Sequence, residues 1–88
     1  MIDPKSLKPV PSTKDKNRIF MSSAGGATTA VYEDQNGYHY ILQVKNGRTM
    51  FRQVGYSIWL AEIDVELVID PYNPMEVIER LFKLAVLR

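Results

Sequence analysis

The chain has 88 residues, a net charge of +1 at pH 7 and 45% hydrophobic residues, which favours a single globular domain. It contains no cysteine, so disulfide bonds and thiolate metal ligands are excluded. A domain this small buries a limited share of its surface, so we expect oligomerisation or docking on a partner to add to its stability.

The chain shows neither an apolar run long enough to span a membrane nor the apolar core of a signal peptide near its start. We therefore expect a cytoplasmic or virion-associated protein that is not secreted by a signal peptide and makes no contact with a membrane.

Residues 1–17 are predicted to form an extended arm. Pro4, Pro9 and Pro11 fall in this segment, which shows no helical or strand periodicity, and proline fixes φ and removes a backbone donor. Residues 1–18 carry five basic and two acidic side chains, whereas residues 58–79 carry six acidic side chains and no Lys or Arg. The two blocks are complementary, so we expect the arm to lie across an acidic sheet face of this chain or of a neighbour. The arm lysines assigned to this contact are Lys5, Lys8, Lys14 and Lys16.

Residues 18–27 are predicted to contain a short strand, RIFMSS, followed by a loop around Gly25 and Gly26. The two glycines do not match a phosphate-binding loop, because neither G-x-x-x-x-G-K-[ST] nor G-x-G-x-x-G is present and no helix pattern follows. We interpret them as a flexible loop or a bulge.

Two Asn-Gly pairs, Asn36-Gly37 and Asn46-Gly47, predict two β-hairpins in series. If both are two-residue type I′ turns, the register follows by counting outward from each turn. The predicted pairs are Lys45 with Arg48, Leu42 with Phe51 and Tyr40 with Gln53 in the second hairpin, and Val31 with Leu42, Tyr32 with Ile41 and Asp34 with His39 in the first.

This register sorts the hairpin residues into a core face and a mixed face. The mixed face predicts an alternative function in nucleic-acid binding, in which Tyr32 or Tyr56 stacks on bases and the basic side chains of this face and of the arm meet phosphates. Against that function stand the near-zero net charge and the absence of zinc-finger, helix-turn-helix and RRM patterns. The predicted core row is Val31, Tyr38, Tyr40, Leu42, Val44 and Phe51, and the alternative nucleic-acid contacts are Tyr32, Lys45, Arg48 and Arg52.

Residues 58–70 are predicted to form a long, half-buried strand, because apolar residues there alternate with Glu62, Asp64 and Glu66. Carboxylates at alternate positions of a strand stand about 6.5–7 Å apart, too far for all three to ligate one ion. We therefore expect an acidic face that meets a partner, and no metal site.

Residues 74–87 are predicted to form a helix, with Asn73 as N-cap, Pro74 at the first position and Glu76 closing a capping box. Its apolar surface is wider than one stripe, so a helix that covers one sheet face needs a second burial partner. The alternative is that its last residues tuck over the sheet edge. The inward stripe is Ile78, Leu81, Phe82 and Ala85, and the predicted interface residues are Val77, Leu84, Val86 and Leu87.

Catalysis is not expected. The single histidine, His39, lies opposite Asp34 in the predicted register and is interpreted as a cross-strand polar pair rather than a general base. No cysteine nucleophile and no serine triad context is present. We expect no cofactor and no small-molecule substrate.

Together these patterns predict an α+β fold, with a four- to five-stranded antiparallel β-meander and one C-terminal helix packed on a sheet face. A small SH3-like or OB-like barrel is the structural alternative. The expected organisation is an arm over residues 1–17 and one domain over residues 18–88. The expected function is a non-enzymatic interaction or assembly subunit that docks on itself or on a neighbour in a larger particle, such as a phage particle.

Overall fold

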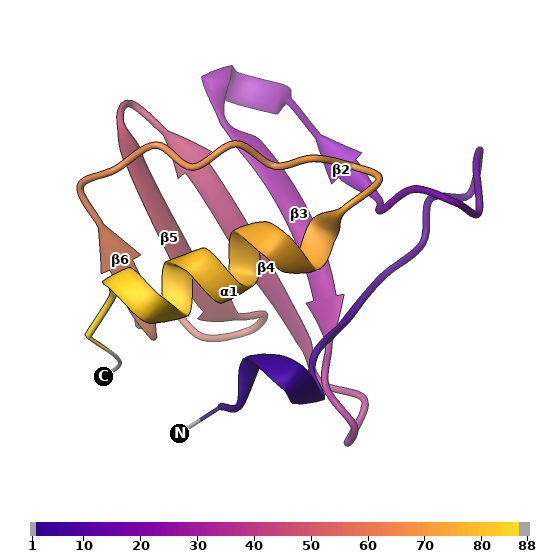
Figure 1. Cartoon of the computed structure of the whole chain (residues 1–88), viewed down its shortest axis with the longest axis horizontal. Coiled ribbons are helices and arrows are strands. Elements are labelled where there is room, and N and C mark those ends of the chain that lie inside the picture. Colours follow the sequence, from indigo (N-terminus) through magenta and orange to yellow (C-terminus); the bar gives the residue numbers. More distant parts are fainter. Residues whose placement is uncertain (1, 87–88) are drawn as a thin grey trace.

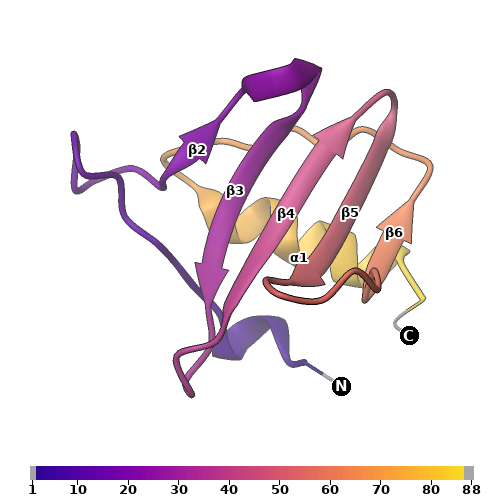
Figure 2. The same cartoon turned by 180° about the vertical axis from the view of Figure 1, so that it is seen from behind.

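A six-stranded antiparallel sheet packs against one helix in the computed structural model, which describes residues 2–86 (Figures 1 and 2). The strand order is β1-β3-β4-β5-β6, and β2 also pairs with β3. The sheet is open over the described residues, so the predicted α+β meander is confirmed and the barrel alternative is wrong. The elements are η1 (Pro4–Ser6), β1 (Lys8–Pro9), β2 (Met21–Ser22), η2 (Ala24–Gly26), β3 (Thr28–Glu33), β4 (His39–Lys45), β5 (Arg48–Gln53), β6 (Ala61–Ile63) and α1 (Pro74–Leu84).

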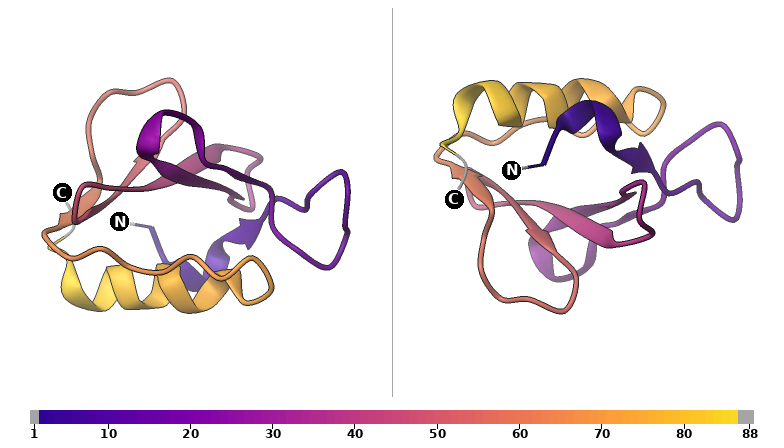
Figure 3. Two further views of the ribbon diagram at one scale, coloured as in Figure 1. Left: turned by 90° about the horizontal axis from the view of Figure 1, so that it is seen from above. Right: turned by 90° about the horizontal axis from the view of Figure 1, so that it is seen from below.

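The molecule has two layers, which Figure 3 shows from the side. One layer contains α1 together with η1, and the other is the sheet. The loop between β5 and β6 and the short η2 stand on the face of the sheet that points away from α1 (Figure 3). The two faces of the sheet are therefore covered very differently.

The N-terminal segment packs on its own domain. The strand β1 pairs with β3 through Lys8 with Glu33 and Pro9 with Tyr32, and Leu7 belongs to the buried core. The segment thus lies at the sheet edge opposite β6, so the prediction that it crosses the acidic strand is wrong within this chain. The buried side chain of Leu7 favours this position, because it is removed from water only where the segment lies against the core.

The second predicted hairpin is confirmed. Asn46 has φ of 51° and Gly47 has φ of 77°, as both central residues of a type I′ turn require. The observed pairs include Lys45 with Arg48 and Leu42 with Phe51. A two-residue turn therefore sets the register between β4 and β5, as the sequence predicts.

The first predicted hairpin is wrong by one residue. The backbone N–H of Asp34 donates to the carbonyl of Tyr38 at 2.9 Å. The turn therefore contains three residues, 35–37, instead of the predicted two. The carboxylate of Asp34 accepts from the backbone N–H groups of Asn36 and Tyr38 at 2.8 and 3.0 Å, which stabilises the longer turn. Gly37 alone then needs a positive φ, and it has 85°.

This one-residue shift exchanges the two faces of β3. Tyr32 pairs with Tyr40 rather than Ile41, and its side chain is 0% exposed in the core. Its hydroxyl donates to the carbonyl of Pro74 at 2.6 Å, and burial raises its pKa. Val31 consequently lies on the outer face, and Tyr38 is exposed, so two members of the predicted core row are wrong.

The turn at Asp34 predicts a pH-dependent contribution to stability. The hydroxyl of Tyr40 donates to Asp34 Oδ2 at 2.7 Å; this bond and the two backbone bonds lower the pKa of Asp34 below its ordinary 3.8. Burial and the same bond raise the pKa of Tyr40 to about 12. A carboxyl whose pKa is lower in the folded than in the unfolded state stabilises the fold at pH values above the ordinary pKa. This contribution is lost as the pH falls through the pKa of the folded state.

We expect Tyr40→Phe to move the pKa of Asp34 back toward its ordinary value, because the largest cause of the shift is removed. An NMR titration of the Asp34 side-chain carboxyl carbon measures this directly. Tyr38→Phe is the matched control, since its hydroxyl makes no bond to Asp34 and the backbone N–H remains. An unchanged titration in Tyr40→Phe would contradict the assignment.

The strand predicted over residues 58–70 is much shorter, because only Ala61–Ile63 pairs with β5. Beyond Ile63, the backbone forms hydrogen bonds with the side chain of Thr49 instead of with a neighbouring strand. Thr49 Oγ1 donates to the carbonyl of Val65 at 2.7 Å and accepts from the N–H of Leu67 at 3.0 Å. The chain therefore leaves the sheet and runs along one flank of α1 (Figure 1).

The helix α1 ends at Leu84, because Ala85 has an extended backbone with φ of −91° and ψ of 151°. The predicted helix over residues 74–87 is therefore too long at its C-terminal end. Pro74 begins the helix as predicted. The side chain of Asn73 does not cap the helix backbone; its amide donates to Glu76 Oε2 at 3.0 Å. The predicted capping box is thus replaced by a side-chain pair.

Candidate interaction surfaces

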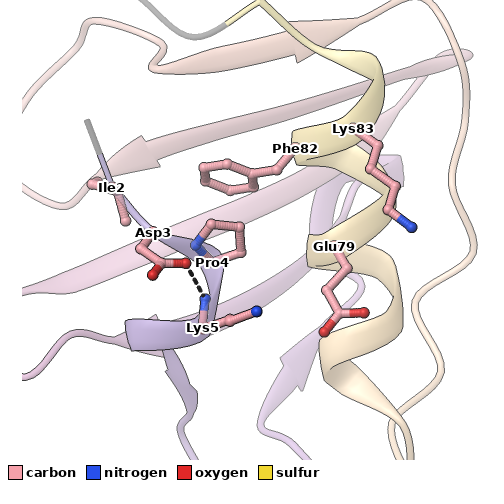
Figure 4. Close-up of a pocket in the computed structure, with 7 residues that line it drawn as sticks. All are labelled: Ile2, Asp3, Pro4, Lys5, Glu79, Phe82 and Lys83. Carbon is pink, nitrogen blue, oxygen red and sulfur yellow. Dashed lines mark hydrogen bonds between the residues drawn. The ribbon is translucent and has the colours of Figure 1, made fainter.

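A groove lies between η1 and α1 (Figure 4). Asp3 builds its N-terminal wall, because its carboxylate accepts from the Lys5 N–H at 2.9 Å and fixes the first turn of η1. Pro4 follows at the first helical position. The groove has a volume of about 670 Å³ and is lined by Ile2, Asp3, Pro4, Lys5, Glu79, Phe82 and Lys83.

The groove combines an apolar floor with a charged rim. The rings of Phe82 and Pro4 lie close to one another across it, and Ile2 adds a third apolar side chain (Figure 4). Two lysines and two carboxylates surround this floor, so the rim carries no net charge. Such a surface suits an apolar anchor side chain of a partner, held among polar neighbours.

The helix end adds exposed apolar side chains. Leu84 is 56% exposed and Val86 is 86% exposed, where the sequence predicts interface residues. Val77 is only 2% exposed, so its predicted role at an interface is wrong. Val77 is covered because the segment that carries Leu67 and Ile69 lies along that flank of the helix and joins the same core. Leu87 lies outside the described residues.

The acidic residues of the predicted strand face contact their own chain. Arg48 Nε lies 3.0 Å from Asp64 Oδ1, and Arg48 Nη2 lies 3.5 Å from Glu62 Oε2. Glu66 accepts from the N–H of Gly47 at 3.0 Å. The hairpin between β4 and β5 therefore neutralises part of this face. Among residues 2–86, no three metal-ligating side chains gather into a cluster.

The basic residues assigned to nucleic acid are largely engaged. Arg52 Nη1 donates to the carbonyl of Tyr56 at 2.6 Å, and its guanidinium lies 5.4 Å from the centroid of the Trp59 ring, a cation–π contact. Arg48 pairs with acidic side chains, and Tyr32 is buried, so the predicted stacking of Tyr32 on bases is wrong. Lys45 remains exposed.

The four arm lysines do not form one patch. Lys5 lines the groove and Lys8 lies in β1, whereas Lys14 and Lys16 belong to a loop before β2. All four side chains are exposed. Because the acidic face lies at the other sheet edge, these lysines point to contacts other than their own Glu62, Asp64 and Glu66.

The loop between β5 and β6 is a surface that the sequence prediction missed. Residues 53–61 carry no charged side chain, and Val54, Tyr56 and Ile58 are all exposed. Arg52 braces the loop through the bond to Tyr56. The uncharged run of residues 53–61 could have indicated this surface. It was missed because Ile58 was assigned to the predicted strand.

The histidine has a different partner from the predicted one. His39 Nε2 lies 3.7 Å from Glu33 Oε2, and both side chains are about half exposed. Asp34, its predicted partner, binds Tyr40 instead. The shifted register of the first hairpin places Glu33 opposite His39, so the pair is a surface contact between neighbouring strands.

No protein-family model, curated protein or solved structure matches this chain. The fold belongs to the α+β class, with an open antiparallel sheet and, over the described residues, one α-helix packed on it. Over the part of the chain that the structure describes, no helix has the length and apolar character needed to cross a bilayer.

Proposed function

We propose that this chain is a non-enzymatic interaction or assembly subunit that docks on a copy of itself through the C-terminal end of α1 and the groove beside it. In a larger particle, such as a phage particle, the same surface would meet a neighbouring subunit. The observation that supports this most directly is the exposure of Leu84 and Val86 at the end of a helix whose other side lines an apolar groove. Exposed apolar side chains next to a concave apolar surface are typical of protein interfaces.

The two sides of the helix end carry different features, a groove and exposed apolar side chains. Phe82 lies on the groove side, where it also contacts Phe51 of the core at a centroid distance of 5.6 Å. Leu84 is two positions further along, so it projects to the other side of the helix. One copy can therefore supply an exposed leucine or valine and its partner a groove of about 670 Å³.

The nucleic-acid alternative has less support. It retains Lys45, the arm lysines and the exposed Tyr56, but it loses Tyr32 to the core. The guanidinium groups of Arg48 and Arg52 already have partners within the chain. Phosphate contacts from these arginines would first have to break those bonds, so no nucleic-acid function is proposed.

We expect the wild-type chain to sediment as a species larger than its 10.1 kDa monomer, and Leu84→Glu to shift it to the monomer. A glutamate placed in an apolar contact loses burial and adds an unpaired charge, so association should weaken by at least about 30-fold, which corresponds to roughly 2 kcal/mol at an interface centre. Sedimentation velocity over a range of concentrations measures this.

Val68→Glu is the matched control. Val68 is 83% exposed and belongs to the segment between β6 and α1, which runs along the flank of α1 opposite η1 (Figure 1), so the same chemical change is made outside the proposed surface. It should assemble as the wild type does. A wild-type chain that stays monomeric at all concentrations, or a Leu84→Glu variant that assembles normally, would contradict the proposal. Circular dichroism confirms that both variants are folded.

A further inference from the structure

A second hollow lies at the far edge of the sheet from β6, between a loop over residues 12–18, the start of β2 and Pro71. It has a volume of about 400 Å³. Four of its nine lining residues are apolar and five are polar or basic. They are Ser12, Thr13, Lys14, Arg18, Ile19, Phe20, Met21, Ser23 and Pro71.

The loop that forms this hollow is closed at its neck by backbone hydrogen bonds. Pro11 and Ile19 form a β-bridge, and the N–H of Ser12 donates to the carbonyl of Arg18 at 2.9 Å. The N–H of Ile19 donates to the carbonyl of Pro71 at 2.9 Å, which ties the loop to the segment before α1. The loop projects from the molecule beside β2 (Figure 1), but its two ends are fixed.

The hollow is cationic. Lys14 and Arg18 line it, and no Asp or Glu does. The nearest acidic residues along the chain are engaged elsewhere: Asp15 accepts from the N–H of Asn17, and Asp70 accepts from the N–H of Tyr72, both at 2.9 Å. Within residues 2–86, neither Lys14 nor Arg18 forms a salt bridge. Two positive charges therefore line one hollow whose lining contains no carboxylate.

Arg18 also carries a buried donor that lacks an acceptor. Its Nε has no hydrogen-bond partner among the described residues, although the atom is shielded by the protein. Buried polar groups are almost always hydrogen-bonded, and an exception of this kind is explained by strain, by a functional role, or by a water or ion that satisfies the donor. An anionic oxygen is the strongest acceptor for a guanidinium group. The hydroxyls of Ser12, Thr13 and Ser23 add further donors to the lining.

We propose that this hollow binds the phosphate group of a small phosphorylated molecule. Arginine, lysine and hydroxyl donors together match the charge and the several acceptor oxygens of a phosphate dianion. The apolar lining by Ile19, Phe20 and Met21 provides a surface for the uncharged body of the molecule. The proposal does not depend on the assembly function, since the hollow and the groove share no residue.

The test is an NMR titration of the 15N-labelled full chain with sodium phosphate and, separately, with AMP, at constant ionic strength maintained by sodium chloride. We expect saturable shifts confined to the amides of residues 12–23 and to the Nε–H signal of Arg18. Tighter binding of AMP than of phosphate would identify a phosphorylated molecule, whereas equal affinity would identify the free anion as the ligand of the same site. Shifts that rise linearly without saturation would overturn the proposal.

Three variants separate the hollow from general positive charge. Arg18→Gln and Lys14→Gln should each weaken phosphate binding by about tenfold or more, as expected for the loss of one charge-assisted contact of roughly 1.4 kcal/mol. Lys16→Gln is the matched control, because Lys16 is an exposed cation of the same loop that does not line the hollow. It should bind within about twofold of the wild type. Equal weakening in all three variants, or in none of them, would overturn the proposal. If Arg18→Gln folds poorly, the comparison of Lys14→Gln with Lys16→Gln still tests the proposal, because Lys14 and Lys16 are both exposed.

Discussion

Phe51→Ala is expected to lower the free energy of unfolding by about 3–5 kcal/mol, as found when large aromatic side chains are removed from cores. Phe51 lies in β5 and is fully buried. Its ring stacks on Tyr40 with a centroid distance of 5.4 Å and an angle of 10°. It meets Phe82 of α1 edge to face at 5.6 Å. Phe51 therefore joins the sheet to the helix, and its removal leaves a cavity between the two layers.

Met50→Ala is the matched control for this experiment. Met50 is the neighbour of Phe51 in β5 but points to the outer face, where it is half-buried. Its replacement should cost about 1 kcal/mol or less. Urea denaturation followed by circular dichroism measures both variants. Equal losses would show that the helix does not cover the face of the sheet that carries Phe51.

The two hairpins show which part of the register could be predicted. The turn at Asn46-Gly47 has no competing side chain, so the two-residue turn forms as expected. At Asn36-Gly37, the carboxylate of Asp34 binds two backbone N–H groups and draws one more residue into the turn. An Asp two positions before an Asn-Gly pair is therefore a signal for the longer turn. Here that one residue decides whether Tyr32 or Val31 faces the core.

The segment after β6 shows that alternation predicts part of the burial and not strand pairing. Leu67 and Ile69 are buried and Val68 is exposed, as the pattern of period two requires, whereas Val65 of the same apolar set is 47% exposed. Their backbone nevertheless leaves the sheet, because the partner of Leu67 is the side chain of Thr49. A side chain that replaces a strand cannot be recognised from the alternation itself.

The candidate surfaces depend on contacts between segments that are distant in the sequence. The sequence alone does not show which of these segments lie side by side. The groove joins residues 2–5 to residues 79–83, and the cationic hollow joins residues 12–23 to Pro71. The helix composition predicts excess apolar surface, and Leu84 is indeed exposed. The helix composition does not show which flank of α1 the preceding segment will cover. In the structure, that segment buries Val77. The angular position of a helix on a sheet is thus a tertiary property.

Thr49 is the residue on which the route of residues 64–67 depends most. Its side chain is fully buried, and its hydroxyl both donates to Val65 and accepts from Leu67. We expect Thr49→Val, which keeps the shape but removes the hydroxyl, to lower the free energy of unfolding by about 1–3 kcal/mol. The cause is that the N–H of Leu67 and the carbonyl of Val65 lose their partner inside the protein.

Thr49→Ser is the matched control, because serine keeps the hydroxyl and loses only a methyl group, at a cost of about 1 kcal/mol. Hydrogen exchange of the Leu67 amide distinguishes the two effects. It should become much faster in Thr49→Val and remain slow in Thr49→Ser, since only the first variant removes the acceptor. Slow exchange at Leu67 in Thr49→Val would mean that packing of Leu67, rather than the threonine hydroxyl, holds this segment against the sheet.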